Sequence, residues 1–309
     1  MSGYPEVVAG VDIGGTSTSV VLIDAAGEVL AEASAATPAA ESGRAMMNLA
    51  VGLTRDLAAD RGLTVTAVGI GAAGVVDPIT RTVVAASSTF SGWAGFDVGA
   101  TLDHAFGVPN ALVNDVNAFL LGEVAHGSAR GLSNVAGITL GTGVGGALYL
   151  DDRLWDGPHG AAGELGHTPG FVVPGFPEEP CTCGQYGHLE SIASGRSIAR
   201  RYRERGGADL GGAEIAARSD HDADARAVLH EAGLMVGQAA VSLAVMLDIT
   251  HLVVGGGVAG AWAQISGGID AYIAEHPPVT GGVVSVTPSL LGGRAVAVGA
   301  AAQARALLG

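Results

Sequence analysis

Two segments of this chain share one pattern: an apolar strand, a turn rich in Gly and Thr, a second apolar strand and an Asp. The first runs from Gly10-Val-Asp-Ile-Gly-Gly-Thr16 to Asp24, and the second from Gly137-Ile-Thr-Leu-Gly-Thr-Gly143 to Asp151. A pattern that recurs in each half of a chain suggests two duplicated domains. Strand-like apolar runs alternate with segments of helical spacing, which predicts the α/β class.

The Gly-rich turns are candidate phosphate sites. Glycines let the main chain approach a polyphosphate closely, because no side chain stands in the way. Thr16 adds a hydroxyl donor, and Asp12, at the end of its strand, could orient Mg²⁺ through water. A third cluster, Gly255-Gly-Gly-Val258, also follows a strand. Each turn alone could equally be an ordinary tight connection, but the presence of one in each half favours phosphate binding.

The pair Asn114-Asp115 follows a short apolar strand and precedes a helix expected over residues 118–126. In that position Asn and Asp often serve only as turn or N-cap residues. Alternatively, a carboxylate at a strand end can accept the proton of a hydroxyl as its oxygen attacks the γ-phosphate of ATP. Spacing alone favours the turn or N-cap role.

A dense group of polar residues follows in the second half. It comprises Glu164, His167, Cys181, Cys183, His188 and Glu190. Two thiolates and two imidazoles can complete a tetrahedral zinc site, although two unrelated thiols beside surface histidines are the alternative. The two glutamates flank the group and could hydrogen-bond sugar hydroxyls. Beyond it, residues 189–205 are predicted to form one helix, and residues 222–247 a long one.

Charge limits the partners. The formal net charge is −15, and all 15 basic residues are Arg. This balance argues against nucleic acid or an anionic membrane surface as the main partner. ATP remains possible, since backbone N–H groups and Mg²⁺ can hold phosphates. No signal peptide is recognisable before the strand that begins at Val7. We therefore expect a cytoplasmic protein.

Taken in order, these motifs resemble the ROK family of sugar kinases and related repressors over nearly the whole chain. The stretch from Glu164-Leu-Gly-His167 to Cys181-Thr-Cys183-Gly-Gln-Tyr-Gly-His188-Leu-Glu190 is similar to the family's sugar-and-zinc signature. The resemblance implies two actin-like (ribonuclease H-like) domains with a cleft between them. We expect a small N-terminal domain over residues 1–118 plus about 290–309, and a larger one with the zinc loop over residues 119–289.

The resemblance also implies an activity and its residues. The reaction would be ATP-dependent phosphorylation of a hexose or N-acetylhexosamine, at the 6-hydroxyl, with Mg²⁺ and a structural Zn²⁺. Asp115 would be the general base. The sugar would contact Gly74, Asn114, Asp115, Glu164, His167 and Glu190. ATP and Mg²⁺ would contact Asp12, Gly14, Gly15, Thr16, Gly141, Thr142, Gly143, Gly256 and Gly257. Zinc would bind His167, Cys181, Cys183 and His188, and the protein would be a homodimer or homotetramer.

Three departures from the family pattern bear on these expectations. His188 stands where members usually carry Cys, and Ser17 where many carry Lys. The stretch Ser87-Ser-Thr-Phe-Ser-Gly-Trp93 lacks an Asn that is more often present, which leaves the sugar open among glucose, N-acetylglucosamine and N-acetylmannosamine.

Other functions remain to be weighed. A sugar-responsive transcriptional regulator of the family would carry a helix-turn-helix domain, which we do not expect before Val7. A sugar-binding protein without catalysis would not need Asp115 and both Gly/Thr turns. A polyphosphate-dependent glucokinase would favour a basic channel, for which a Lys-free acidic chain gives little support.

Overall fold

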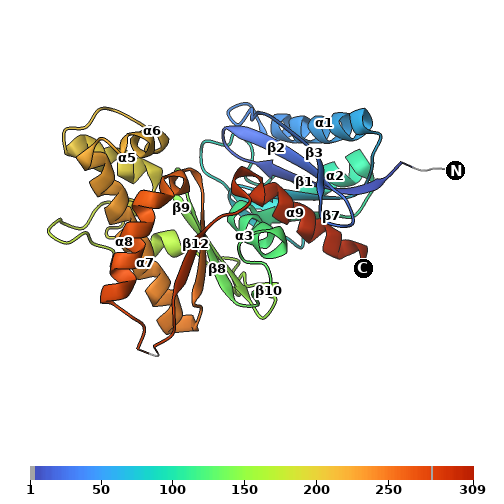
Figure 1. Ribbon diagram of the computed structural model, residues 1–309. Helices are drawn as coiled ribbons and strands as arrows, with labels where there is room; N and C mark the ends of the chain where they lie inside the picture. Colours follow the sequence, from blue (N-terminus) through green and yellow to red (C-terminus); the bar gives the residue numbers. More distant parts are fainter. Residues whose placement is uncertain (1–3, 280) are drawn as a thin grey trace. The chain divides into compact units, whose positions relative to one another are not determined.

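The computed structural model describes residues 4–279 and 281–309, which form two compact units (Figure 1). Unit 1 comprises the described residues up to Gly131, together with Asp156–Ala161 and Gly293–Gly309. Unit 2 comprises Leu132–Trp155 and the described part of Ala162–Gly292. The boundary expected after residue 118 falls inside the helix Asp115–His126 of unit 1. The two units instead divide after Gly131, which leaves that helix whole.

Unit 1 is built on a five-stranded sheet with strand order β3-β2-β1-β4-β7. The strands are β1 (Glu6–Ile13), β2 (Ser17–Ile23), β3 (Val29–Ala36), β4 (Thr64–Ala72) and β7 (Asn110–Asn114). A separate two-stranded sheet pairs β5 (Val75–Asp77) with β6 (Thr82–Ala85). The helices are α1 (Gly43–Arg61), α2 (Val98–Phe106), α3 (Asp115–His126) and α9 (Ala295–Arg305), with short 3₁₀ turns at Gly292–Arg294 and Ala306–Leu308.

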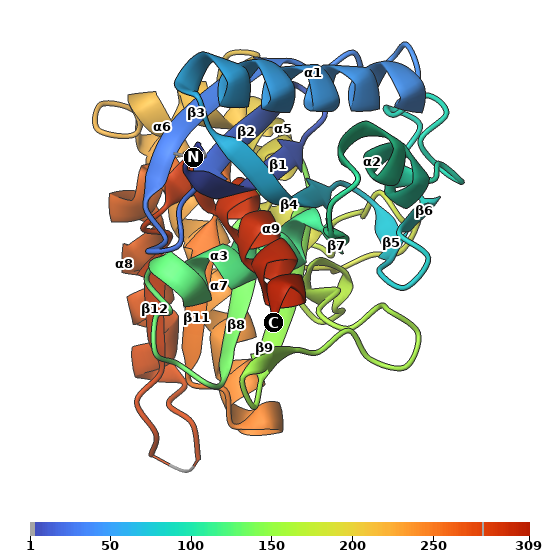
Figure 2. The ribbon, with the colours of Figure 1, turned by 90° about the vertical axis from the view of Figure 1, so that its right-hand side faces the viewer.

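The two faces of β1 have different roles, since successive residues of a strand face opposite sides. Val7 and Val11 belong to the apolar core that includes residues of α1. Gly10 faces α9 instead, and a Cβ there would lie 1.9 Å from the Ala297 carbonyl oxygen. Glycine therefore lets α9 lie directly on the sheet. Figure 2 shows α1 on one side of this sheet and α3 and α9 on the other. Asp12 follows Gly10 on the α9 face.

Unit 2 has the same topology as unit 1. Its sheet has strand order β10-β9-β8-β11-β12, with β8 (Val135–Leu140), β9 (Val144–Leu150), β10 (Arg153–Leu154), β11 (His251–Gly255) and β12 (Ser285–Pro288). In each sheet three antiparallel strands are followed by two parallel ones. The two Gly/Thr turns connect β1 to β2 and β8 to β9. The duplication and the α/β class predicted from the sequence are both confirmed.

The helices of unit 2 share one apolar core with this sheet. They are η1 (Leu165–His167), α4 (Glu190–Ala193), α5 (Gly195–Glu204), α6 (Gly212–Arg218), α7 (Ala223–Leu247), η2 (Gly257–Ala261) and α8 (Trp262–Glu275), where η marks a 3₁₀ helix. Among the described residues, α7 alone has the length and hydropathy of a membrane span. Many of its apolar residues, such as Val228 and Val236, are fully buried in the core of unit 2, whereas Val245, Met246 and Leu247 at its end are exposed.

The single helix predicted over residues 189–205 is wrong in one respect: the structure has two helices, α4 and α5, separated at Ser194. Ser194 is extended, with φ −72° and ψ 154°, and its side chain accepts a hydrogen bond from the Ser197 N–H as the N-cap of α5. The Gly195 N–H donates to the Gly141 carbonyl oxygen at 2.8 Å. The break therefore places the start of α5 against the Gly/Thr turn of unit 2.

Candidate phosphate, sugar and metal sites

The turn between β1 and β2 carries three of the residues expected at phosphate: Gly14, Gly15 and Thr16. The Gly14 N–H donates to the Ser17 carbonyl oxygen at 3.0 Å, which closes the turn. Gly15 and Thr16 are exposed. A closed turn with exposed small residues can present its backbone to an anion such as a phosphate.

Asp12, at the end of β1, and Asp115, at the start of α3, are coupled acids. Burial, and after it the negative charge of Asp115, raises the pKa of Asp12 to about 7. Asp115 occupies the first turn of α3, where the helix dipole stabilises a carboxylate. A buried carboxylate beside a second negative charge favours binding of a proton or a divalent cation. Unit 1 therefore brings together the two carboxylates to which the sequence assigned Mg²⁺ and base catalysis.

Asn114 ties the start of α3 to the loop of Gly74. Its Oδ1 accepts hydrogen bonds from the N–H groups of Val116 and Asn117 at 2.9 and 3.1 Å. Its Nδ2 donates to the Gly74 carbonyl oxygen at 3.0 Å and to Asp115 Oδ1 at 2.9 Å. Gly74 has a φ of 108°, a conformation that favours glycine. Asn114 is thus an N-cap, as one interpretation of the sequence held, and it also fixes one oxygen of Asp115.

Trp93 ends the stretch Ser87–Trp93, to whose individual residues the sequence assigned no role. Its indole Nε1 donates to the Ala73 carbonyl oxygen at 3.2 Å, and the residue is fully buried. The Gly74 loop is therefore held from two sides, by Trp93 and by Asn114. Trp93 could have been noticed from its chemistry, because a buried Trp needs a hydrogen-bond acceptor for its N–H group.

The Gly/Thr turn of unit 2, Gly141–Val144, is held mainly by neighbours from the region of α4 and α5. The Gly141 carbonyl oxygen accepts from Gly195, as described above. The Thr142 carbonyl oxygen accepts from Arg196 Nε at 3.0 Å, and the Val144 N–H donates to Glu190 Oε2 at 3.0 Å. The side chain of Thr142 stays exposed. Because the sequence predicts a phosphate site at this turn, we call Gly141–Val144 the phosphate turn.

Gly256 and Gly257 lie beside the phosphate turn. Gly256 has a φ of 86°, and a Cβ there would lie 2.5 Å from the Leu140 carbonyl oxygen. The backbone after β11 therefore passes directly against the residue that precedes Gly141. A Cβ at Gly257 would meet no atom within 4 Å. The second and third Gly clusters of the sequence are thus brought together in unit 2.

Glu190 was expected on the sugar, and the structure shows what its carboxylate contacts within the protein. The side chain is only 9% exposed. Oε2 accepts from Val144, while Oε1 accepts from the Thr182 hydroxyl at 2.6 Å. A Cβ at Gly143 would lie 2.5 Å from Oε2. Glu190 therefore touches both the phosphate turn and the loop that carries the cysteines.

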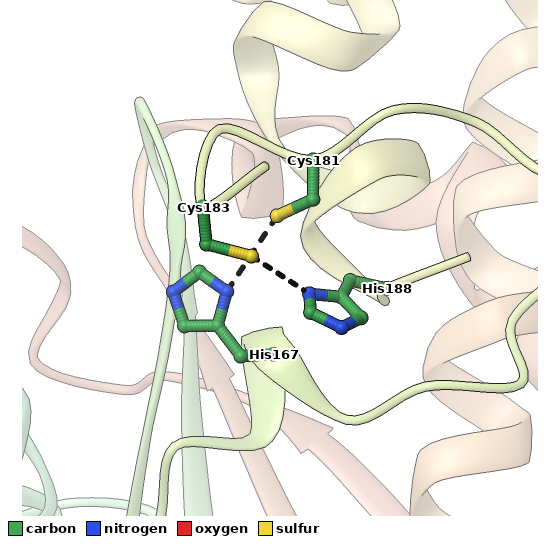
Figure 3. Close-up of side chains that lie close together, drawn as sticks. All are labelled: His167, Cys181, Cys183 and His188. Atoms are coloured by element: carbon green, nitrogen blue, oxygen red, sulfur yellow. Dashed lines mark hydrogen bonds between the residues drawn. The ribbon is translucent and has the colours of Figure 1, made fainter. Parts of the chain in front are cut away.

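His167, Cys181, Cys183 and His188 form a compact cluster, in which the candidate ligand atoms all lie within 4.8 Å of one another (Figure 3). Cys181 Sγ lies 3.6 Å from His167 Nδ1, and Cys183 Sγ lies 3.4 Å from His188 Nδ1. Tetrahedral zinc with ordinary bond lengths separates a sulfur and a nitrogen ligand by about 3.6 Å. The four side chains therefore fit zinc.

The environment of His188 supports the same fit. His188 Nε2 lies 3.2 Å from the side-chain oxygen of Gln185. A hydrogen on Nε2 satisfies that oxygen and leaves the Nδ1 lone pair directed toward the cluster, as in many metal-bound histidines. His188 is also buried. The imidazole of His188 is thus placed to serve as one of the four candidate ligands.

Glu164 and His167 lie at η1, which packs on β9. A Cβ at Gly166 would lie 2.0 Å from the Val144 carbonyl oxygen, so glycine permits this close approach. Glu164 is exposed and immediately precedes η1. His167 is the last residue of η1, with Nδ1 directed toward Cys181. Both expected sugar residues of this segment therefore lie in unit 2.

Arg196 is a second residue of this region that lies outside the sequence motifs. Besides its bond to the Thr142 carbonyl, its Nη2 lies 3.9 Å from Glu190 Oε1. It lies in the first turn of α5, where the helix dipole disfavours a cation. A basic residue is unfavourable in the first turn of a helix. Its presence there was the sequence signal that could have identified Arg196.

Comparison with known proteins places the chain in a family. A model described as the ROK family matches residues 8–306. A glucokinase of Halalkalibacterium halodurans is 30% identical over 270 residues, which cover 82% of this chain and 80% of that protein. An N-acetylmannosamine kinase of Escherichia fergusonii is 29% identical over 271 residues, which cover 86% of this chain and 88% of that protein.

The fold agrees with this assignment. One similar structure is the crystal structure of a ROK family glucokinase from Streptomyces griseus in complex with glucose and AMPPNP. Its sequence is 30% identical to that of this chain. The two superpose with a TM-score of 0.82, over 97% of this chain and 99% of the other. Two actin-like α/β units, as the resemblance implied, are therefore confirmed. The chain belongs to the ROK family.

Proposed function

We propose that this protein is an ATP-dependent sugar kinase that phosphorylates a hexose or N-acetylhexosamine at its 6-hydroxyl. Its family and its glucokinase and N-acetylmannosamine kinase relatives support the reaction class. The observation that carries the proposal is the pair Asp12 and Asp115. Burial of Asp12, and after it the negative charge of Asp115, raises the pKa of Asp12, as expected where one carboxylate serves a cation and the other a proton transfer.

In the proposed reaction, Asp115 accepts the proton of the sugar hydroxyl. The sugar oxygen forms a bond to the γ-phosphorus as the bond from that phosphorus to the bridging oxygen of ADP breaks. Asn114 Nδ2 and the Val116 N–H both hold Asp115 Oδ1, which orients the carboxylate. Asp12 would orient Mg²⁺ through water, and the bound Mg²⁺ would supply charge neutralisation at the β- and γ-phosphates.

The remaining expected residues are assigned to two substrates and one metal. The turns at Gly14–Thr16, Gly141–Gly143 and Gly256–Gly257 would cradle ATP through backbone N–H groups. Gly74, Asn114, Glu164, His167 and Glu190 would join Asp115 around the sugar. Zinc would hold His167 through Nδ1, so that Nε2 is the nitrogen available to a sugar hydroxyl.

The wider context of the proposal follows the family. We expect a cytoplasmic enzyme whose partners are a sugar and a nucleotide, without nucleic acid or membrane. We also expect a homodimer or homotetramer.

A coupled phosphorylation assay tests the function. Glucose, N-acetylglucosamine and N-acetylmannosamine are each offered with ATP and with polyphosphate. The proposal predicts turnover of at least one sugar with ATP. Turnover with polyphosphate alone would contradict the ATP assignment. A protein that binds one of the sugars but transfers phosphate from neither donor would favour a sugar-responsive regulator instead.

A further inference from the structure

Glu190 is a buried carboxylate whose hydrogen-bond donors come from two functionally distinct segments. The Val144 N–H belongs to the phosphate turn. The Thr182 hydroxyl belongs to the loop between the two cysteines of the metal cluster. A buried carboxylate needs such donors, because it has lost its hydration. Any change that removes one donor therefore changes how the carboxylate holds the other.

We propose that Thr182 and Glu190 form a positioning link through which the metal cluster controls nucleotide affinity at the phosphate turn. Thr182 is flanked on both sides by candidate ligands, Cys181 and Cys183. A bound metal ion would fix this loop, and with it the Thr182 hydroxyl at Glu190 Oε1. A loop released from the metal would leave Glu190 Oε1 without its 2.6 Å partner.

The other end of the link contacts the backbone that would hold phosphate. Glu190 Oε2 lies so close to Gly143 that a Cβ there would be 2.5 Å away. The Val144 N–H fixes the exit of the turn, while Arg196 joins the Thr142 carbonyl to the neighbourhood of Glu190. A shift of the Glu190 carboxylate would therefore displace the phosphate turn itself. All of these groups lie in unit 2.

Such a link predicts that the affinities for metal and for nucleotide depend on each other. If metal and nucleotide favour the same position of Glu190, each raises the affinity of the other by the same factor. Removal of zinc should then weaken nucleotide binding measured without sugar. This inference rests on the proposed kinase function, because it assigns nucleotide to the phosphate turn.

The test compares wild type with Thr182→Val, which removes the hydroxyl and keeps the side-chain shape. Thr182→Ser restores a hydroxyl, and Thr287→Val, in β12 of the same unit, is the matched control. The dissociation constant of AMPPNP with Mg²⁺ is measured by calorimetry for zinc-loaded and zinc-stripped protein, and elemental analysis verifies the zinc content.

We expect stripping to raise the AMPPNP dissociation constant of wild type about fivefold or more, within the usual range of coupling. Zinc-loaded Thr182→Val should show a similar increase, and stripping should add less than about twofold to it, because the link is already broken. Thr182→Ser and Thr287→Val should behave as wild type.

Wild-type affinity that stays within about twofold on stripping would overturn the inference. So would a Thr182→Val protein that responds to stripping as wild type does. If stripped protein unfolds, zinc-loaded Thr182→Val decides alone, since unchanged AMPPNP affinity there overturns the link. A wild-type protein that binds no AMPPNP in either state would contradict the kinase function itself, which is a distinguishable result.

Discussion

Asp115 is the residue on which the proposed chemistry depends most. We expect Asp115→Asn to lower kcat by about 10²- to 10⁴-fold, the usual effect of losing a general base. The fold should be retained, because an Asn carbonyl oxygen can still accept the bonds that Asn114 and Val116 donate to Oδ1. Steady-state kinetics and thermal unfolding measure the two effects.

The matched control is Asp56→Asn on the exposed surface of α1, which should keep full activity. An Asp115→Asn enzyme that retains more than about a tenth of wild-type activity would show that another group accepts the proton.

Asp12 predicts a pH dependence of stability. Its pKa is raised from 3.8 to about 7, first by burial and then by Asp115. Between these values the folded protein holds a proton that the unfolded chain releases, so the free energy of unfolding falls as the pH rises through this range. The variant Asp12→Asn cannot ionise and should escape this loss. In Mg²⁺-free buffer, its gain in Tm over wild type should be larger at pH 8 than at pH 5. An equal gain at both values would contradict the assigned pKa.

At the scale of elements, the loop with the cysteines predicts metal binding. We expect about one zinc per chain in protein purified without added metal. Chelation should lower Tm, because metal affinity contributes to folded-state stability. His188→Ala should lose the metal, whereas His188→Cys should retain it, since a thiolate can take the same tetrahedral position.

Elemental analysis and thermal unfolding measure these effects, with His276→Ala at the end of α8 as the control. A well-folded, fully active protein with far less than one zinc per chain would show that the cluster serves another purpose.

Local sequence predicted some elements well and others incompletely. Neighbouring residues alone determine the helical spacing of α7 and the Gly turns after β1 and β8. The sequence could therefore predict these features. The break at Ser194 could not be predicted in this way, because residues 189–205 have helical spacing throughout. The break is stabilised by the bond from Gly195 to Gly141, which lies far away in sequence. The contact of Glu190 with Val144, which lies 46 residues away, could not be predicted for the same reason.

At the scale of the whole molecule, the sequence predicted the duplicated topology. It did not predict how the chain passes between the two units. The repeated strand–turn–strand pattern predicted two related units. The short segment Asp156–Ala161, however, belongs to unit 1, although it lies between stretches of unit 2. Asp156 accepts a hydrogen bond from Asn117 Nδ2 of α3 at 2.8 Å. A contact between residues so distant in sequence has no local signature.

The central claim is that the whole chain transfers the γ-phosphoryl group of ATP to a sugar. The most direct test incubates purified protein with Mg²⁺, γ-labelled ATP and each of the three sugars, and identifies the labelled product by mass spectrometry and NMR. We predict label on the 6-oxygen of at least one sugar with wild type, and little or none with Asp115→Asn. Label that appears only in inorganic phosphate, or no loss of label from ATP with any sugar, would contradict the account.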